Sequence, residues 1–288
     1  MSKEALYYES INDNVKCLLC PNYCIIKNNS SGICRKRVNR DGKLYAENYA
    51  ETISLCLDPM RKKPLYHFYP EDEILSLGAN SCNLSCSFCQ NYKSSQLDCS
   101  TEKIMPEDLI EIIKKHNRNS LEEKPIKHVA FTYTEPFTWY EYILDCAKLL
   151  KENDISVVLV TNGYVNPDPL SVIVPYIDAM NIDLKAFSDK FYVDICGGKL
   201  QPVLNTIEYT NSRTHIEITL LLIEGLNDNE NELQQMFSFI AGINKNIPLH
   251  ITRYYPRYKI NIDATNDFAI SRAKDLAKKC NLINVYGV

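Results

Sequence analysis

Residues 82–89 of this 288-residue chain read CNLSCSFC, which places Cys82, Cys86 and Cys89 in a C-x3-C-x2-C pattern. The stretch follows a predicted strand at residues 73–78. Three thiolates on one loop suit a [4Fe–4S] cluster in which the protein holds three irons and leaves the fourth open. An open iron can bind a substrate or a cofactor, whereas a fully ligated site cannot. The stretch therefore predicts a reactive cluster.

A structural zinc site is the alternative interpretation of these three cysteines. Such a site takes four ligands in a tetrahedron, usually from two pairs of residues. Cys99 or His116 would then supply the fourth ligand. In the cluster interpretation, Phe88, between the second and third cysteines, would place an apolar ring beside the cluster and tune its access to solvent.

Apart from its cysteines, the chain has the composition of an ordinary globular protein. Apolar residues make up 45% and charged residues 24%. The 32 Lys and Arg against 36 Asp and Glu give a net charge of −4, which does not favour binding to nucleic acid through bulk charge. No apolar run reaches the roughly 18–20 residues of a membrane helix. The first ten residues, MSKEALYYES, lack the apolar core of a signal peptide. We therefore expect a soluble, cytoplasmic protein.

The chain has 12 cysteines, and clustered thiols in a reducing cytoplasm are metal ligands more often than disulfides. A second group, C-x2-C-x3-C-x9-C, consists of Cys17, Cys20, Cys24 and Cys34. Four thiolates are enough to close a metal site. Both zinc in a ribbon-like knuckle and a second, fully ligated [4Fe–4S] cluster fit this spacing, and cysteines without a metal are the remaining alternative. The others are expected to be small, semi-buried apolar residues: Cys56, Cys99, Cys146, Cys196 and Cys280.

Residues 1–70 differ in composition from the rest of the chain. They have too few aliphatic residues for a sizeable core of their own, so we expect a metal to hold this segment together. Asp41 and Gly42 predict a tight hairpin turn between two short strands. We therefore divide the chain into a cysteine-rich N-terminal segment with a metal site at 1–70 and an α/β domain at 71–288.

From residue 73 onward, predicted strands and helices alternate, which indicates a parallel sheet. Strands are expected at 73–78, 127–133, 155–161, 177–184, 215–223, 248–254 and 282–286. Helices are expected from Pro106 onward and at 138–152, 167–176, 201–212, 229–243 and 266–279. In parallel α/β folds the site lies at the carboxyl ends of the strands, and periodicity does not separate an open sheet from a barrel. Polar residues fall at these ends, namely Asn80, Tyr133, Thr134, Glu135, Thr161, Asn162, Asp183, Lys185, Glu224 and Arg253.

The three-cysteine motif in this position resembles that of the radical S-adenosylmethionine (SAM) enzymes. Most of the chain also resembles one branch of that superfamily, which is related to pyruvate formate-lyase activating enzyme and belongs to the AmmeMemoRadiSam system. The similar segments are CPNYC at 20–24, KKPLYHF at 62–68, CQNY at 89–92, FTYTEP at 131–136, NIDLKAF at 181–187, ICGG at 195–198, LIEGLND at 222–228 and RYYP at 253–256. The resemblance implies a partial parallel (β/α)6 TIM-like barrel with a small N-terminal cysteine-rich metal-binding subdomain.

The same resemblance implies the cofactors, a [4Fe–4S] cluster and SAM, and residues that bind them. Glu135 corresponds to the residue that meets the SAM amino group, and Thr161 and Asn162 to a segment beside the ribose. Asp183 and Lys185 match an Asp-x-Lys strand whose lysine reaches the SAM carboxylate, where a charge-assisted hydrogen bond is expected. The ordinary alternatives are a helix start at Glu135, a turn at Thr161 and Asn162, and a surface ion pair between Asp183 and Lys185.

Two later residues complete the predicted site. His250 resembles a position beside the adenosine or the substrate, and Arg253 ends the same predicted strand. Together with Lys185 they are the candidates for catalytic roles, although His250 also suits a buried core position and Arg253 an ordinary strand end. The chain departs from the superfamily at Tyr133 and Thr134, which replace two glycines.

The leading hypothesis is a radical SAM enzyme that cleaves SAM to a 5′-deoxyadenosyl radical, which abstracts hydrogen from an unidentified substrate. A glycyl-radical-enzyme activase is one alternative, although the ferredoxin-like cysteines often inserted after the triplet in activases are absent here. A non-catalytic zinc or iron–sulfur scaffold or electron carrier is another. The resemblance implies an electron donor such as flavodoxin or ferredoxin, and Memo-like and AMMECR1-like partners. The substrate class, whether small molecule, protein or RNA, does not follow from the sequence.

Overall fold

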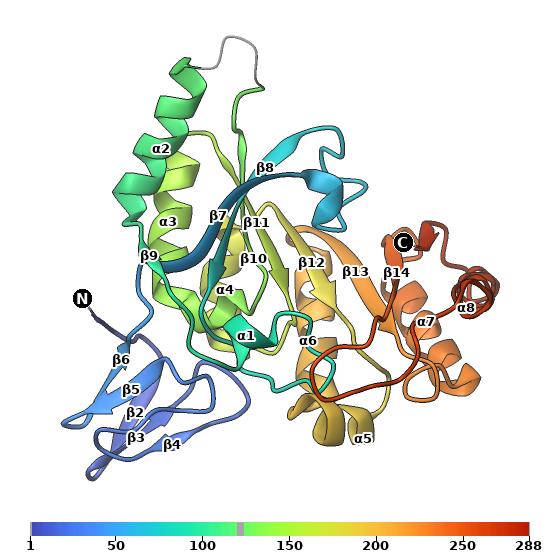
Figure 1. Ribbon diagram of the computed structural model, residues 1–288, viewed down its shortest axis with the longest axis horizontal. Coiled ribbons are helices and arrows are strands. Elements are labelled where there is room, and N and C mark those ends of the chain that lie inside the picture. The colour runs from blue at the N-terminus through green and yellow to red at the C-terminus, as the bar shows by residue number, and fades with distance from the viewer. Residues whose placement is uncertain (1, 120–123, 288) are drawn as a thin grey trace.

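The computed structural model describes residues 2–119 and 124–287, and at its centre is a nine-stranded sheet. Its strands are β7 (Glu51–Pro59), β8 (Glu73–Ala79), β9 (Glu102–Lys103), β10 (His128–Thr132), β11 (Ser156–Thr161), β12 (Ala179–Asp183), β13 (His215–Leu222), β14 (Leu249–Arg253) and β15 (Val285–Gly287). Their order is β15-β14-β13-β12-β11-β10-β8-β7-β9 (Figure 1). The strands from β8 to β15 run parallel, and β7 pairs antiparallel with both β8 and β9.

Helices connect the parallel strands and pack against the sheet. They are α1 (Tyr92–Ser95), α2 (Pro106–Asn119), α3 (Tyr140–Glu152), α4 (Pro167–Ile173), α5 (Asp189–Phe191), α6 (Leu200–Asn211), α7 (Glu230–Asn244) and α8 (Asp267–Lys279). Short turns of other helix types are η1 (Met60–Lys62), η2 (Pro136–Trp139), η3 (Val174–Tyr176) and η4 (Tyr192–Cys196), the last being a π-helical turn. Helices α3, α6 and α8 contact β11, β13 and β14.

The predicted partial barrel is confirmed. Every residue of β10 is buried, as expected for a parallel strand covered on both faces. The edge strands β9 and β15 lie at opposite ends of the strand order, so the sheet is not closed. The carboxyl ends of its strands therefore form one continuous edge at which polar side chains gather.

Some elements differ from the sequence-based prediction. The antiparallel strand β7 was not predicted, and the helix predicted at 167–176 divides into α4 and η3. Pro175 lies inside η3, and proline has no N–H to continue an α-helix. The predicted last strand begins later, at Val285.

The N-terminal part forms two small antiparallel sheets. One has the order β1-β6-β5 and the other β2-β3-β4, built from β1 (Lys3–Glu4), β2 (Tyr8–Ile11), β3 (Asn14–Cys17), β4 (Ile25–Ile26), β5 (Arg37–Arg40) and β6 (Lys43–Ala46). The predicted hairpin turn is present: Arg40 pairs with Lys43, and Asp41 and Gly42 both have positive φ. Strand β7 belongs to the central sheet, and the division of the chain near residue 70 stays a prediction.

The segment after β7 fills the amino end of the barrel. Met60 and Leu65, both fully buried, pack with residues from the first half of four neighbouring strands, namely Ile74, Ala130, Val158 and Ala179. These residues form a hydrophobic cluster separate from the main core between sheet and helices. The interior of the barrel is thus packed at this end.

Glu217 of β13 fixes this segment in place. Its fully buried carboxylate accepts hydrogen bonds from the backbone N–H groups of Tyr66 (2.9 Å) and His67 (2.8 Å). It also accepts hydrogen bonds from the rings of His215 (2.9 Å) and His250 (2.6 Å). Burial alone would raise the pKa of Glu217, but these donors outweigh it and lower the pKa to about 2.

We expect Glu217→Gln to destabilise the fold at pH 7 by about 3 kcal/mol, because a carboxyl whose pKa is lower in the folded than in the unfolded chain stabilises the fold when ionised. This contribution is complete above the unfolded pKa and is lost as the pH falls toward 2. Urea unfolding between pH 3 and 8 should therefore show the variant and the wild type converging at the acid end. Glu71→Gln, at an exposed ion pair with Arg61, should change little. Equal stabilities at pH 7 would contradict this expectation.

Candidate functional site

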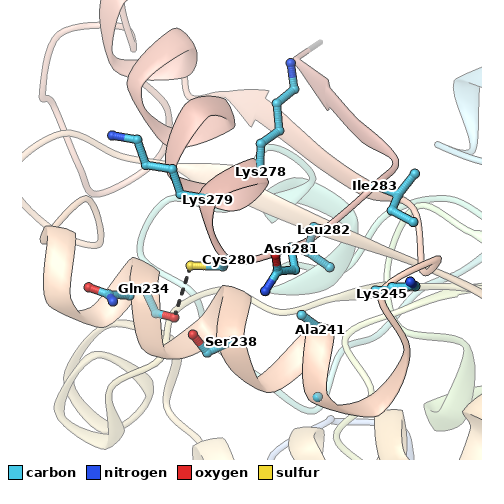
Figure 2. Close-up of a pocket in the computed structure, with 11 residues that line it drawn as sticks. Gln234, Ser238, Ala241, Lys245, Lys278, Lys279, Cys280, Asn281, Leu282 and Ile283 are labelled. Atoms are coloured by element: carbon cyan, nitrogen blue, oxygen red, sulfur yellow. Dashed lines mark hydrogen bonds between the residues drawn. The ribbon is translucent and has the colours of Figure 1, made fainter.

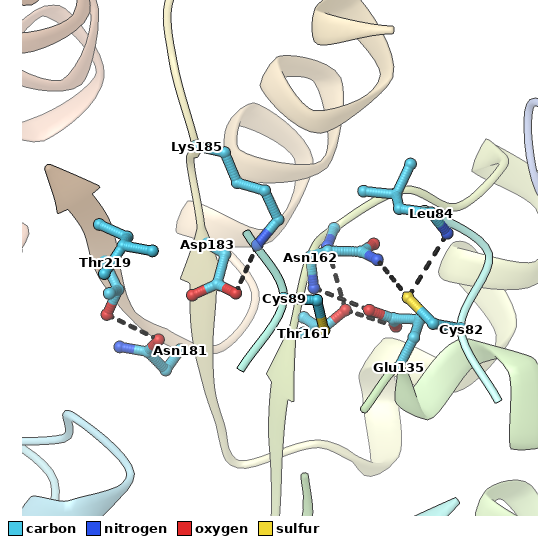
Figure 3. Close-up of polar contacts among 12 residues, drawn as sticks. Cys82, Leu84, Cys89, Glu135, Thr161, Asn162, Asn181, Asp183, Lys185 and Thr219 are labelled. Carbon is cyan, nitrogen blue, oxygen red and sulfur yellow. Dashed lines mark hydrogen bonds and ion pairs between the residues drawn. The ribbon is translucent and has the colours of Figure 1, made fainter. Parts of the chain in front are cut away.

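The three cysteines of the C-x3-C-x2-C motif follow β8 and line one cavity of about 310 Å³. The cavity lies at the carboxyl ends of the parallel strands, and Figure 3 shows part of its wall. Cys99 and His116, the candidate fourth ligands of a zinc site, are not among its lining residues. The other lining residues are Phe88, Gln90, Asn91, Ser95, Tyr133, Thr134, Asn162, Asp183, Lys185, Thr219, Leu221, Thr252 and Arg253.

The donor set fits a [4Fe–4S] cluster, because each thiolate of such a cluster binds a different iron and the thiols therefore surround a volume. Burial raises the pKa of Cys82 well above its usual value and also raises the pKa of Cys89. A bound cation would favour the thiolate form of both and so counteract this effect of burial.

Neighbouring polar groups donate hydrogen bonds to two of these sulfurs. Cys82 Sγ accepts from the Leu84 N–H (3.4 Å) and from Asn162 Nδ2 (3.7 Å) (Figure 3). Ser95 Oγ lies 3.2 Å from Cys89 Sγ. Hydrogen bonds of this kind orient thiolate ligands and stabilise their charge.

Lys185 and Asp183 form an ion pair in the wall of the cavity, with 2.9 Å between Nζ and the carboxylate (Figure 3). Burial by itself lowers the pKa of Lys185, but the Asp183 carboxylate outweighs this and the pKa lies well above its usual value. Lys185 therefore stays protonated. The predicted alternative, a surface ion pair, describes it only in part, because the Asp183 side chain is 37% exposed whereas the Lys185 side chain is only 13% exposed.

Glu135 is fully buried and is not among the lining residues of the cavity. Its carboxylate accepts hydrogen bonds from Thr161 Oγ1 (2.7 Å), the Asn162 N–H (2.8 Å) and the Phe137 N–H (3.0 Å). It thereby caps η2, as the helix-start alternative predicts, and fixes the turn after β11. Burial raises the pKa of Glu135 to about 7. The preceding residue, Thr134, lines the cavity instead.

Of the remaining residues predicted for the site, some line the cavity and others do not. Asn162 lines the cavity, whereas Thr161 is buried beneath it. Arg253 lines the cavity and forms an ion pair with the exposed Asp267. His250 does not line the cavity: it is fully buried at the amino end of β14 and bonded to Glu217. The core-histidine alternative thus describes the position of His250 in this structure.

The four N-terminal cysteines surround a second, much smaller cavity. Its lining includes Arg37, Asn83 and all four of these cysteines, namely Cys17, Cys20, Cys24 and Cys34. Burial raises the pKa of Cys17 to about 11. Asn22 Nδ2 donates a hydrogen bond to the Asn83 carbonyl (2.7 Å), so this segment directly contacts the loop of the three-cysteine motif.

A larger cavity, of about 910 Å³, lies between α7 and α8 (Figure 2). Its polar lining includes Lys245, Lys278 and Lys279, and the Cys280 thiol donates to the Gln234 carbonyl (3.9 Å). None of the residues predicted for the site lies there. The three-cysteine cavity therefore remains the candidate site.

Comparison with known proteins decides the family. The model of the radical SAM superfamily matches residues 77–240, more than half of the chain. The chain belongs to the radical SAM superfamily. Members of this superfamily are enzymes that bind a [4Fe–4S] cluster and SAM, so the predicted enzyme class is confirmed.

Two relatives from one archaeon match most of the chain. The uncharacterized protein MJ0808 of Methanocaldococcus jannaschii is 36% identical over 291 residues, which span 99% of this chain and 84% of that protein. MJ1632 of the same organism, whose name proposes a glycyl-radical enzyme activating role, is 27% identical over 220 residues, 74% of this chain and 80% of that protein.

Solved radical SAM structures share the fold. A radical SAM methyltransferase from Sphaerobacter thermophilus superposes with a TM-score of 0.56 at 12% identity, covering 100% of this chain and 76% of that one. A domain of pyruvate-formate lyase-activating enzyme from Bacteroides vulgatus gives 0.50 at 17% identity, covering 56% and 98%. The predicted relationship to activase-like radical SAM proteins is confirmed, and the narrower resemblance to the AmmeMemoRadiSam system stays a prediction.

The sequence-based interpretation missed several residues that line the three-cysteine cavity. Thr219 and Thr252 line the cavity from β13 and β14; the alternation of side chains along predicted strands gives the face on which they lie but not their distance from the cavity. Within residues 2–119 and 124–287, no helix is both long enough and apolar enough to cross a membrane.

Proposed function

We propose that this chain cleaves SAM reductively with a [4Fe–4S] cluster held by Cys82, Cys86 and Cys89. The observation that carries the proposal is that these three thiols and the Lys185–Asp183 ion pair line a single cavity of about 310 Å³. When bound there, the cluster and SAM supply the radical that removes hydrogen from the substrate.

The residues of the cavity wall have distinct roles in this proposal. The protonated Lys185 ammonium binds the SAM carboxylate through a charge-assisted hydrogen bond, and Asp183 orients that ammonium. Asn162, which also lines the cavity, donates a hydrogen bond from its side-chain amide to the Cys82 sulfur. Thr161 and Glu135 act from beneath by holding the backbone of Asn162 in place. Arg253, at the rim, is a cation available to a substrate.

A glycyl-radical-enzyme activase is the second candidate function, and the name of the relative MJ1632 favours it. Its substrate would be the backbone of a partner protein. In either case the cluster needs an external electron donor, such as flavodoxin or ferredoxin. Memo-like and AMMECR1-like proteins are proposed as partners on the strength of the sequence resemblance alone.

Anaerobic reconstitution with iron and sulfide, followed by dithionite and SAM, tests the proposal. We expect 5′-deoxyadenosine to form in proportion to the amount of cluster. A fully loaded cluster that produced none would favour the scaffold or electron-carrier alternative. A protein radical detected by electron paramagnetic resonance on an added partner would identify an activase.

We further propose that Cys17, Cys20, Cys24 and Cys34 hold a second metal centre, either zinc or a fully ligated [4Fe–4S] cluster. The support is that all four thiols line one cavity, two of them fully or largely buried against Arg37 and Asn83. Four thiolates leave no open position, so this centre has a structural or electron-carrying role.

Cys17→Ala should remove this second metal and destabilise the N-terminal segment, because metal binding and folding are coupled in so small a unit. The first cluster should still assemble. Elemental analysis gives the identity and amount of each metal, and limited proteolysis reports cleavage within residues 1–46. Unchanged metal content and unchanged proteolysis would contradict the proposal. Cys56→Ala, an exposed cysteine outside both groups, is the control.

A further inference from the structure

Cys196 is a fourth cysteine beside the three-cysteine loop. It is fully buried at the end of the π-helical turn η4, and its thiol faces that of Cys86. It is not among the lining residues of the cavity, so it contacts Cys86 from within the protein. The sequence placed it only among small, semi-buried apolar residues.

Backbone hydrogen bonds fix this contact. The Ser85 N–H donates to the Cys196 carbonyl (2.8 Å), and the Ser87 N–H donates to the Ile195 carbonyl (2.9 Å). These two donors flank Cys86 in the chain. The turn that carries Cys196 is therefore attached to the loop on both sides of the Cys86 side chain.

Two glycines allow this close approach. Gly197 has a φ of +72°, and a Cβ at this position would collide with Ser85 Oγ. A Cβ at Gly198 would lie 2.5 Å from the Leu84 side chain. The ICGG stretch thus has the composition needed to bring one thiol against one cysteine of the motif.

We propose that Cys196 is a positioning residue that donates an S–H···S hydrogen bond to the Cys86 ligand and thereby makes the cluster easier to reduce. The inference rests on the proposed [4Fe–4S] cluster. As a ligand, Cys86 is a thiolate and can only accept, so Cys196 is the donor. A hydrogen bond to a ligand sulfur stabilises the reduced state, which is the more negative one, and raises the reduction potential.

The other two ligands have donors of a different kind. Cys82 receives an amide N–H and a side-chain amide, and Cys89 faces the Ser95 hydroxyl. With Cys196 on Cys86, each of the three sulfurs of the motif has a hydrogen-bond donor from the chain. Removing one donor should therefore shift the potential without removing a ligand.

The test compares Cys196→Ala with Cys196→Ser in the full-length, anaerobically reconstituted protein. Iron content and SAM cleavage by the wild type are measured first, since their absence would contradict the proposed function itself. Redox titration followed by electron paramagnetic resonance then measures the potential. At a given applied potential, we expect Cys196→Ala to show about a tenfold lower ratio of reduced to oxidised cluster, which is about 59 mV for one electron.

The control and the second variant make the result decisive. Cys196→Ser keeps a donor and should stay within about threefold of the wild-type ratio. Cys146→Ala removes a buried thiol in α3, and should change nothing. A fully loaded Cys196→Ala cluster with the wild-type potential would overturn the inference. If Cys196→Ala does not assemble a cluster, Cys196→Ser is the deciding variant. A wild-type potential in Cys196→Ser supports the inference. Loss of its cluster, or a tenfold lower ratio of reduced to oxidised cluster, overturns it.

Discussion

Replacing Cys86 with alanine is expected to abolish assembly of the first cluster and formation of 5′-deoxyadenosine together. Cys86 is the central thiol of the motif, is only 7% exposed, and lines the cavity with Cys82 and Cys89. Two thiols leave a [4Fe–4S] cluster without one of its three protein anchors, and no open iron remains in a fixed position for SAM. The loss should be about four iron atoms per chain, whatever metal the N-terminal cysteines hold.

Iron and sulfide analysis after anaerobic reconstitution, with product detection by mass spectrometry, measures both effects in one sample. Cys280→Ala is the matched control, because Cys280 lies in the cavity between α7 and α8, away from the motif. A Cys86→Ala protein with full iron content and wild-type turnover would show that the ligand assignment is wrong.

The second large effect is expected at Arg37, which attaches the N-terminal sheets to α3. Its guanidinium forms two hydrogen bonds to the Glu141 carboxylate, 2.8 and 2.7 Å long, and both side chains are 1% exposed. Arg37→Met leaves the Glu141 charge buried and unpaired. Loss of one partner of such a pair costs about 3–5 kcal/mol in the free energy of unfolding.

A second substitution separates the unpaired charge from lost packing. Arg37→Met combined with Glu141→Leu removes both charges and should recover most of the stability, because apolar replacements of a whole buried pair are often neutral. Arg40→Met, at an exposed pair with Glu47 on the same hairpin, should cost less than about 1 kcal/mol. Urea unfolding measures all three. A loss below about 1 kcal/mol for Arg37→Met would contradict the expectation.

The sheet could be predicted because parallel strands are buried on both faces. The run ISVVLVT at 155–161 has the nearly continuous apolar character that this burial requires, and it forms β11. Strand β7 lacked this signal, since most of its side chains are only partly buried. The cysteine loop could be predicted from spacing because its three cysteines are close together in the chain, and all three line one cavity.

Residues that meet only through the fold were harder to predict. His250 and Thr252 lie on the same face of β14, but only Thr252 is near enough to the carboxyl end to line the cavity. Position along the strand, which periodicity does not give, decides between them. Glu135 looked like a ligand-binding carboxylate, yet its oxygens are used by Thr161 and two backbone N–H groups.

Residues 60–68 pack at the amino end of the barrel and are held there by Glu217, so the three-cysteine cavity at the other end of the strands is not reached from that side. In the proposed reaction, the substrate would then enter and 5′-deoxyadenosine would leave at the carboxyl ends of the strands, beside the cysteine loop. A large molecule bound at the opening of this cavity would block the release of a smaller molecule bound further inside. A protein or peptide substrate bound there would itself cover the cavity and shield the reacting atoms from solvent.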